Sequence, residues 1–169
     1  YLVEDYSRYY EDPEAFSHVL GYTGRMDSTD IKNNPQYPIS DIIGKMGLET
    51  YYERYLHGVS GKKLIEVNAQ SEMNPNLGEI SAKPGNNLIT TIDKDLQIEL
   101  YKDLKTTITN LHINKGAGLA INPKTGEVLA LVSFPSINVN ILTKGAPRID
   151  IDKMTNNIYM PFINRVISG

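Results

Sequence analysis

The chain has 169 residues, of which 40% are hydrophobic and 22% charged, as in ordinary globular domains. A net charge of −3 argues against a protein that binds the phosphate backbone of nucleic acid, and no apolar run approaches the ~20 residues of a membrane helix. The absence of cysteine excludes disulfides, thiolate nucleophiles and cysteine-based zinc sites. No signal-peptide pattern is present, and we expect the sequence to be a piece of a longer protein.

The first 33 residues predict short extended segments and one short helix. Residues 1–10 are aromatic and β-prone, residues 11–14 form a turn, and residues 18–24 are predicted to return as a strand that ends on glycine. Residues 28–33 suit a short helix capped by Ser28.

A longer helix is predicted from about Ser40 to Leu56. The spacing i, i+3, i+4, i+7 and i+8 of one buried face is followed by Leu48, Tyr51, Tyr52, Tyr55 and Leu56. Gly58 occupies the position just past the helix end where glycine is favoured.

Three motifs of this region resemble the pedestal motifs of class B penicillin-binding proteins. They are Arg8-Tyr9-Tyr10, His18-Val-Leu-Gly21-Tyr-Thr-Gly24, and Gly44-Lys-Met-Gly47-Leu-Glu49 with a trailing Leu56-His-Gly58. The family has proline where this chain has Glu11, which loosens the first turn. In that family, an arginine and a glutamate from these motifs tie the pedestal together near the transpeptidase domain.

We predict an ion pair between Arg8 and Glu49. Glu49 lies one residue off the predicted buried stripe, and a guanidinium fork can grip a carboxylate and hold two distant segments in register. The alternative is two solvated charges that contribute almost nothing. His18 has no metal-ligand spacing to His57 or His112, so a structural histidine bonded to backbone is predicted.

A change of composition places a domain boundary near Gly85. All eleven tyrosines except Tyr101 and Tyr159 lie in the first 55 residues, and aliphatic runs concentrate after Leu88. Residues 64–70 and 77–83 are predicted to pair as strands across a loop at residues 73–76. We therefore expect a pedestal over residues 1–85 and a second unit over residues 86–169.

The second unit begins with a predicted strand, helix and hairpin. Residues 88–92 are β-branched and apolar, Asp93 suits a helix N-cap, and a helix is predicted to about Leu111. Its buried stripe is expected to comprise Leu96, Leu100, Tyr101, Leu104, Ile108 and Leu111.

Residues 116–121 and 127–132 are predicted to form a hairpin, with Gly126 left-handed in the turn. Both strands are apolar on both faces, and one helix covers one face, so an apolar face or strand edge is expected to stay exposed or to be covered by a second copy. Residues 136–148 are predicted to be a loop, and residues 149–156 one or two helical turns.

The second unit also resembles class B penicillin-binding proteins, at the entry to their transpeptidase domain. The matching residues are Asn87-Leu-Ile-Thr-Thr-Ile-Asp93, Asn122-Pro-Lys-Thr-Gly-Glu-Val-Leu-Ala130, Ser133-Phe-Pro-Ser136 and Pro161-Phe-Ile-Asn164-Arg165. In that family the last motif leads to Pro-Gly-Ser-x-x-Lys, which holds the nucleophilic serine. The resemblance thus implies an α+β fold whose nucleophile lies beyond Gly169.

No catalytic, cofactor or metal site is predicted within these residues. The one Ser-x-x-Lys spacing, Ser60 to Lys63, follows Gly58 and precedes a predicted strand, so it lacks the helix that would align hydroxyl and amine. The resemblance, closer to elongation-type members, implies a fragment of a peptidoglycan D,D-transpeptidase that acts as a scaffold. It also implies the extracytoplasmic face of the bacterial inner membrane. The implied partners are a membrane glycosyltransferase and a cell-shape scaffold protein, with peptidoglycan and β-lactams bound only outside this chain. The alternative is a stand-alone α+β protein-interaction module.

Overall fold

The computed structural model describes residues 8–63, 66–67, 73–74 and 79–168. The helices are α1 (Ser17–Leu20), α2 (Ser28–Asn33), α3 (Gly47–Tyr51), α4 (Glu53–Leu56), α5 (Lys94–Asn110), α6 (Val139–Thr143), α7 (Arg148–Thr155) and α8 (Arg165–Ser168). The strands are β1 (Thr23–Arg25), β2 (Ile42–Gly44), β3 (Lys62–Lys63), β4 (Glu66–Val67), β5 (Met73–Asn74), β6 (Glu79–Ile80), β7 (Gly116–Ile121) and β8 (Val128–Phe134). In this part of the chain the strands form the antiparallel pairs β1–β2, β3–β6, β4–β5 and β7–β8. The predicted α+β class is confirmed.

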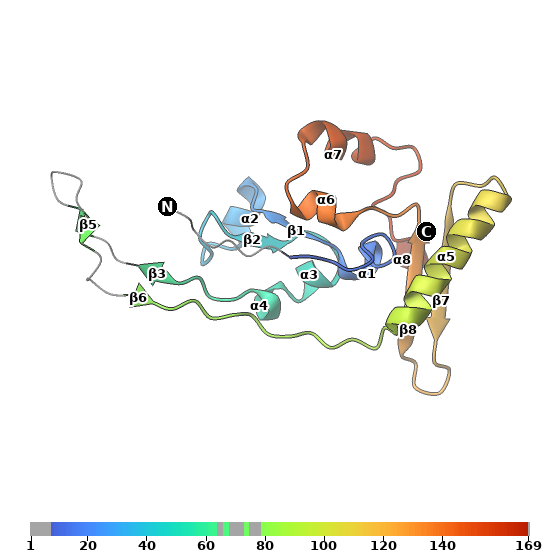
Figure 1. Cartoon of the computed structure of the whole chain (residues 1–169), viewed down its shortest axis with the longest axis horizontal. Helices are drawn as coiled ribbons and strands as arrows, with labels where there is room; N and C mark the ends of the chain where they lie inside the picture. Colours follow the sequence, from blue (N-terminus) through green and yellow to red (C-terminus); the bar gives the residue numbers. More distant parts are fainter. Residues whose placement is uncertain (1–7, 64–65, 68–72, 75–78, 169) are drawn as a thin grey trace.

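The molecule is elongated, with the β3–β6 arm at one end and α5 with the β7–β8 hairpin at the other (Figure 1). Between these ends, the N-terminal region (residues 8–63) lies beside α6 of the C-terminal region (residues 93–168) (Figure 1). Helix α6 packs against β1, and α1 packs against β8, so the two regions meet along a shared junction.

Helix α5 and the hairpin form as predicted. The Asp93 side chain accepts a hydrogen bond from the Leu96 amide at 3.0 Å and caps α5. Gly126 has a φ of +77° and closes the turn between β7 and β8. Tyr101 on α5 packs with Ala15 and Val132 in a buried cluster, so this core joins the N-terminal region, α5 and β8.

The buried face of α5 differs from the predicted stripe. Gln97, Tyr101 and Ile108 are buried, whereas Leu96 and Leu111 are exposed. The stripe is rotated because α5 presents Gln97 to the backbone of β8. On the outward face of β7, Leu119 and Ile121 are 46% and 48% exposed, so the predicted exposed apolar face is confirmed.

Two predictions for the N-terminal region were wrong. Residues 18–24 are not one strand, because Ser17–Leu20 form a helical turn that packs on α3 and only Thr23 onward is β1. The helix expected from Ser40 to Leu56 is divided into β2, α3 and α4.

This division follows from strand pairing and from backbone conformation. Ile42–Gly44 pair with β1, Gly47 takes a φ of +64°, and Tyr52 leaves the helical conformation between α3 and α4. The predicted buried stripe fails with it, since Tyr51 and Tyr55 are exposed and Glu49 is buried instead.

Three further corrections concern local structure. Residues 88–92 are not a strand. Thr91 Oγ1 donates to the Val128 carbonyl of β8, and the Asp93 amide donates to the Leu129 carbonyl. The pairing does not continue along β8, because the Gln97 side chain bonds to the Leu131 amide and carbonyl. Helix α2 is capped by Asp27, one residue before the predicted Ser28. The loop predicted over residues 136–148 contains α6, whose Asn138 cap and contact with β1 stabilise a helix that periodicity did not reveal.

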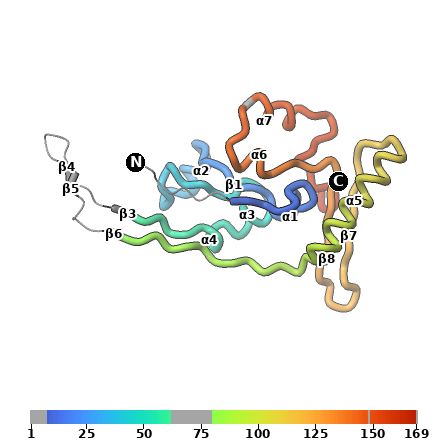
Figure 2. Tube along the Cα trace, in the orientation of Figure 1, coloured from blue at the N-terminus to red at the C-terminus, as the bar shows by residue number. Residues whose placement is uncertain are grey.

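The arm consists of two chain segments that run side by side on the way to β3 and from β6 (Figure 2). Val59 and Lys83 exchange backbone hydrogen bonds at 2.8 and 2.9 Å. The predicted pairing of residues 64–70 with 77–83 falls partly outside the described residues. Where the structure describes them, the prediction is wrong: Glu66–Val67 pair with Met73–Asn74 of the predicted loop, and Glu79–Ile80 pair with Lys62–Lys63. Among the described helices, none combines the length and apolarity that crossing a membrane requires.

Candidate functional site

Glu49 is the centre of a polar cluster in the N-terminal region. Its Oε1 lies 3.3 Å from Arg8 Nε and accepts a hydrogen bond from the Tyr10 hydroxyl at 3.1 Å. The Glu49 side chain is 12% exposed and that of Arg8 48%. Burial, and secondarily the Glu49 charge, raise the pKa of Tyr10 and keep it a neutral donor. The predicted Arg8–Glu49 ion pair is confirmed, with Tyr10 as an additional partner.

Gly21 and Gly47 allow α1 and α3 to approach each other. Gly21 has a φ of +78° and a ψ of −150°, a region essentially reserved for glycine, and a Cβ there would lie 1.8 Å from the Met46 carbonyl oxygen. Gly47 has a positive φ, and its Cβ would meet the Leu20 and Gly21 backbone at 2.7 Å. Gly21 and Gly47 therefore set how closely α3 approaches α1, and with it the position of Glu49 in the cluster.

The remaining predicted glycines, Gly44 and Gly58, occupy close approaches of the same kind. A Cβ on Gly44 would lie 2.3 Å from the Glu49 backbone, and one on Gly58 would lie 2.4 Å from the Lys83 carbonyl oxygen. Gly44 thus brings β2 against α3, and Gly58 brings the end of α4 against the returning arm.

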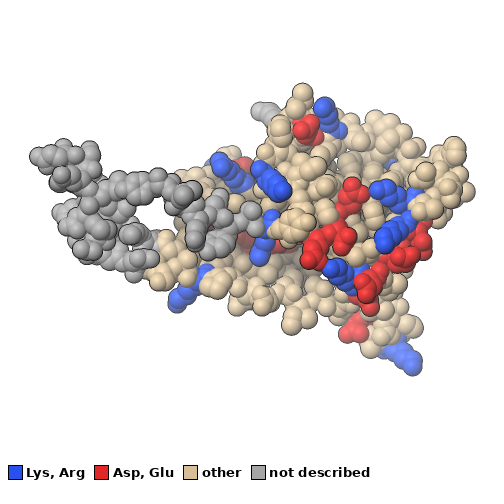
Figure 3. All heavy atoms as spheres, viewed as in Figure 1, with Lys and Arg blue, Asp and Glu red and all other residues tan. Residues whose placement is uncertain are grey.

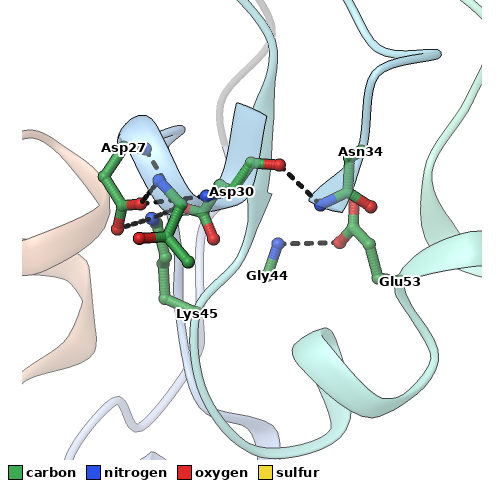
Figure 4. A network of polar contacts seen from close by, with 7 residues as sticks. Asp27, Asp30, Asn34, Gly44, Lys45 and Glu53 are labelled. Carbon is green, nitrogen blue, oxygen red and sulfur yellow. Dashed lines mark hydrogen bonds and ion pairs between the residues drawn. The ribbon is translucent and has the colours of Figure 1, made fainter. Parts of the chain in front are cut away.

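A second polar network holds α2, β2 and α4 together (Figure 4). Asp27 and Asp30 form a capping box at the start of α2 and both pair with Lys45, while Glu53 Oε2 accepts from the Gly44 amide at 2.7 Å. Backbone hydrogen bonds from Asp30 and Thr29 lower the pKa of Asp27 to about 2. This network braces the N-terminal region, and its member Glu53 lines the same pocket as Arg8 and Glu49.

His57 extends this bracing. Its Nδ1 lies 2.9 Å from Glu53 Oε1 and its Nε2 lies 3.1 Å from Asp41 Oδ2, with Tyr37 stacked on the ring.

Three side-chain amide or imidazole groups connect the N-terminal region to the C-terminal region. Asn140 of α6 exchanges two hydrogen bonds with the Tyr10 backbone, at 2.8 and 2.9 Å. Gln97 Nε2 donates to the Ala15 carbonyl at 2.6 Å and the Leu131 carbonyl at 2.7 Å, and its Oε1 accepts from the Leu131 amide at 2.7 Å. His18 Nε2 lies 2.8 Å from the Pro161 carbonyl oxygen, so the predicted backbone-bonded role of His18 is confirmed.

Charged pairs line the rim of this junction. Lys94 pairs with Glu11, and Glu14 accepts from the Tyr101 hydroxyl at 2.7 Å and lies 3.3 Å from Lys105 Nζ. The Tyr101 hydrogen bond, followed by Lys105, lowers the pKa of Glu14. Acidic and basic side chains are interspersed on the face that Figure 3 shows. The rim therefore orients the two regions with paired charges of both signs.

The predicted residues Asn164 and Arg165 organise the segment that leads into α8. Asn164 Oδ1 accepts from the Val166 amide at 3.1 Å. The Arg165 guanidinium donates to the carbonyls of Tyr159, Met160 and Ile163, and its amide donates to Ser133 Oγ at 3.1 Å. Arg165 thus folds the chain between residues 159 and 165 around itself.

Neither serine near a histidine is arranged as a nucleophile. Ser17 Oγ lies 3.1 Å from His18 Nδ1 but is fully buried, and the other ring nitrogen faces a carbonyl instead of a carboxylate. Ser60 bonds to Asp41, which lies between it and His57, so the histidine cannot take its proton. Lys63 lies in β3, so no helix aligns it with Ser60. Within the described ranges no group of three or more His, Cys, Asp or Glu side chains is placed to hold a metal ion.

The cluster and the motifs that build it match a known family over more than half of the chain. Residues 1–90 match the penicillin-binding protein dimerisation domain. The chain belongs to the penicillin-binding protein family.

Relatives of known sequence extend the match across both regions. Peptidoglycan D,D-transpeptidase MrdA of Acinetobacter baumannii is 36% identical over 165 residues, which cover 96% of this chain and 24% of that protein. MrdA of Escherichia coli K12 is 33% identical over 168 residues, which cover 96% and 25%. The chain therefore spans about a quarter of the length of these curated relatives.

Solved structures of penicillin-binding proteins share the fold. The complex of PBP2 and MreC from Helicobacter pylori matches with a TM-score of 0.73 and 33% identity, over 94% of this chain and 28% of that one. PBP2 of Pseudomonas aeruginosa in complex with WCK 5153 matches with a TM-score of 0.71 and 30% identity, over 96% and 31%. The penicillin-binding protein fold thus accounts for the elongated arrangement of both regions.

Sequence reasoning assigned roles to Arg8, His18 and Glu49 but none to Tyr10, Gln97 and Asn140. Gln97 left a readable signal, because it shares a helix face with Tyr101 and Ile108 and a polar residue at such a position needs buried partners. Tyr10 stands in the motif Arg8-Tyr9-Tyr10, but nothing there points to Glu49, 39 positions away, and Asn140 left no signal, since its partner lies 130 positions away.

Proposed function

We propose that this chain is the pedestal, residues 1–85, and the first part of the transpeptidase domain, residues 86–169, of a peptidoglycan D,D-transpeptidase. The parent enzyme cross-links stem peptides by acyl transfer: a serine attacks the D-Ala-D-Ala carbonyl, D-Ala leaves, and an amine of a neighbouring strand resolves the acyl-enzyme. The serine and its activating lysine lie beyond Gly169, and β-lactams react there.

The buried junction is the observation that carries this proposal. Gln97, Asn140 and His18 hold the N-terminal region on α5, α6 and the segment before α8 through hydrogen bonds that are buried or part-buried. A platform fixed in this way suits a pedestal that holds a catalytic domain in a set orientation. The names of the related transpeptidases and the dimerisation-domain match support the same assignment.

Docking of a cell-shape scaffold protein is the second part of the proposal. A groove of ≈ 730 Å³ lies between β2 and the arm, and its lining includes Arg25, Val59 and Lys83. Val59 is 61% exposed, so the groove offers an exposed apolar side chain and two cations among its lining residues. The related H. pylori PBP2 was solved in complex with MreC, which supports a partner of that kind here. A membrane glycosyltransferase is the other partner we propose, at the extracytoplasmic face of the inner membrane.

Labelling with a fluorescent penicillin tests the enzymatic part. The full-length protein should form a covalent adduct that survives denaturation, and residues 1–169 alone should not. An adduct on residues 1–169 would place the nucleophile inside this chain and overturn the assignment, and no adduct on the full-length protein would remove it.

Titration calorimetry with an MreC-type scaffold protein tests the docking part. Val59→Asp should weaken binding at least 10-fold, because a carboxylate in an apolar contact is left desolvated. Ile149→Asp, at an exposed apolar residue of α7, is the matched control and should bind like the wild type. Equal affinity of the two variants would exclude the groove.

A further inference from the structure

The three side chains that connect the two regions, Asn140, Gln97 and His18, bond to different parts of the chain. Asn140 bonds to the Tyr10 backbone and Gln97 to Ala15 and Leu131, so both fix regular elements to one another. His18 reaches a different place, the Pro161 carbonyl in the irregular segment between α7 and α8. Of these three ties, His18 is the one that contacts the segment leading out of the chain toward residue 169.

The His18 ring has a polar partner within reach of each nitrogen. A carbonyl oxygen only accepts, so Nε2 carries the proton and donates to Pro161 at 2.8 Å. The Ser17 hydroxyl has one hydrogen and two acceptors within reach, the Glu14 carbonyl at 3.0 Å and His18 Nδ1 at 3.1 Å. His18 is 8% exposed and Ser17 is fully buried. Burial lowers the pKa of His18 and so favours the neutral imidazole.

The same segment is held from its other side by β8. Ser133, which is 1% exposed, donates to the Ile163 carbonyl at 3.0 Å and accepts from the Arg165 amide at 3.1 Å. Arg165 binds three carbonyls of the segment, and α8 packs on both β7 and β8. Residues 159–165 are therefore clamped between α1 of the N-terminal region and the hairpin.

We propose that His18 is a positioning residue: through Pro161 it sets where residues 159–165 lie and, with them, the chain that continues beyond Gly169. This inference rests on the proposed function, which puts the acylated serine a few residues further along. A displacement of about 1 Å in a reacting side chain slows a reaction by roughly 100-fold. Loss of one hydrogen bond that positions this segment can therefore change the acylation rate. The pedestal then acts on acylation through one side chain, without contacting the substrate.

The test uses the full-length protein and two measurements. His18→Leu removes the hydrogen bond to Pro161, whereas His18→Gln keeps an amide that can donate to the Pro161 carbonyl. We expect the acylation rate with a fluorescent penicillin to fall roughly 10- to 100-fold in His18→Leu and to stay within about 3-fold of wild type in His18→Gln. Amide exchange of the peptide covering residues 159–168 should accelerate in His18→Leu in parallel.

Ile43→Ala is the control, because Ile43 is a buried residue of β2 in the N-terminal region. It should lower the melting temperature while leaving the acylation rate unchanged, which separates positioning from general loss of stability. Should His18→Leu fail to fold, Ser17→Ala removes the hydroxyl that lies beside Nδ1 and the Glu14 carbonyl, leaves the His18–Pro161 bond in place and should slow acylation by a smaller factor.

Three outcomes overturn the inference: wild-type acylation and exchange in His18→Leu, equal slowing in Ile43→Ala, or failure of His18→Gln to restore the rate. Failure of the wild-type protein to acylate would instead remove the proposed function, and the exchange measurement would still decide whether His18 holds residues 159–168.

Discussion

Replacing Gln97 with methionine removes three hydrogen bonds from the junction and changes the side-chain volume little. The Ala15 carbonyl, the Leu131 carbonyl and the Leu131 amide each lose a partner at 2.6–2.7 Å. An unpaired buried backbone group costs about 1–3 kcal/mol, and Gln97 itself is 0% exposed, so water does not replace it without rearrangement. Because Leu131 is only partly buried, we expect a loss of about 3–5 kcal/mol in place of the full sum.

Thermal and urea unfolding of Gln97→Met, compared with the wild-type protein, measure this loss. A change of that size lowers the melting temperature of a chain of this length by roughly 6–20 °C. Thr106→Met, at an exposed position of the same helix, is the matched control and should stay within about 0.5 kcal/mol of wild type. If Gln97→Met is as stable as Thr106→Met, the junction does not depend on its buried amide and the reasoning fails.

Three further predictions concern the N-terminal region. Glu49→Leu should cost about 1–3 kcal/mol of unfolding free energy, because it leaves the buried Tyr10 hydroxyl without its acceptor. Arg8→Met should cost about 0–1 kcal/mol, because the Arg8 side chain is half exposed. Equal losses of the two variants in urea unfolding would show that the Tyr10–Glu49 bond contributes no more than the Arg8–Glu49 pair. Gly21→Ala should destabilise by more than about 4 kcal/mol or prevent folding, because the added Cβ would meet the Met46 carbonyl. Gly126 also has a positive φ, +77°, but has no atom within 4 Å of an added Cβ, so Gly126→Ala should cost only about 1–2 kcal/mol. Melting temperatures that drop equally in the two variants would show that the contact with Met46 does not matter. Burial lowers the pKa of folded His18 below its ordinary value near 6.5, so the unfolded chain binds the proton first and stability should fall as the pH drops from about 6.5 toward the folded pKa; His18→Gln should flatten this part of the melting temperature profile, and an unchanged profile would refute it.

Local signals in the sequence were sufficient for the elements that depend on nearby residues. The Asp93 cap, the 17 residues of α5 and the turn at Gly126 follow from apolar spacing and from residues with special backbone preferences, and all are present. The Arg8–Glu49 pair was predicted from the motifs that resemble class B penicillin-binding proteins and from the fit of a guanidinium to a carboxylate, and the two side chains lie 3.3 Å apart.

The elements that failed are those that tertiary contacts decide. The apolar spacing of residues 42–56 fits one helix, but pairing of Ile42–Gly44 with β1 and the positive φ of Gly47 divide it. Residues 88–92 have the composition of a strand, yet the Gln97 side chain bonds to the Leu131 groups that would have extended the ladder. Propensity differs between states by less than 1 kcal/mol per residue, so a few specific contacts override it.

The sequence by itself determined the fold class, the helix and hairpin of the C-terminal region, and the motif residues Arg8, His18 and Glu49. Only the tertiary structure decided that Tyr10, Gln97 and Asn140 complete the junction and that His18 bonds to Pro161, 143 positions along the chain. The physical reason is that a buried polar side chain must find a partner, but which distant backbone group supplies it depends on how the two regions pack.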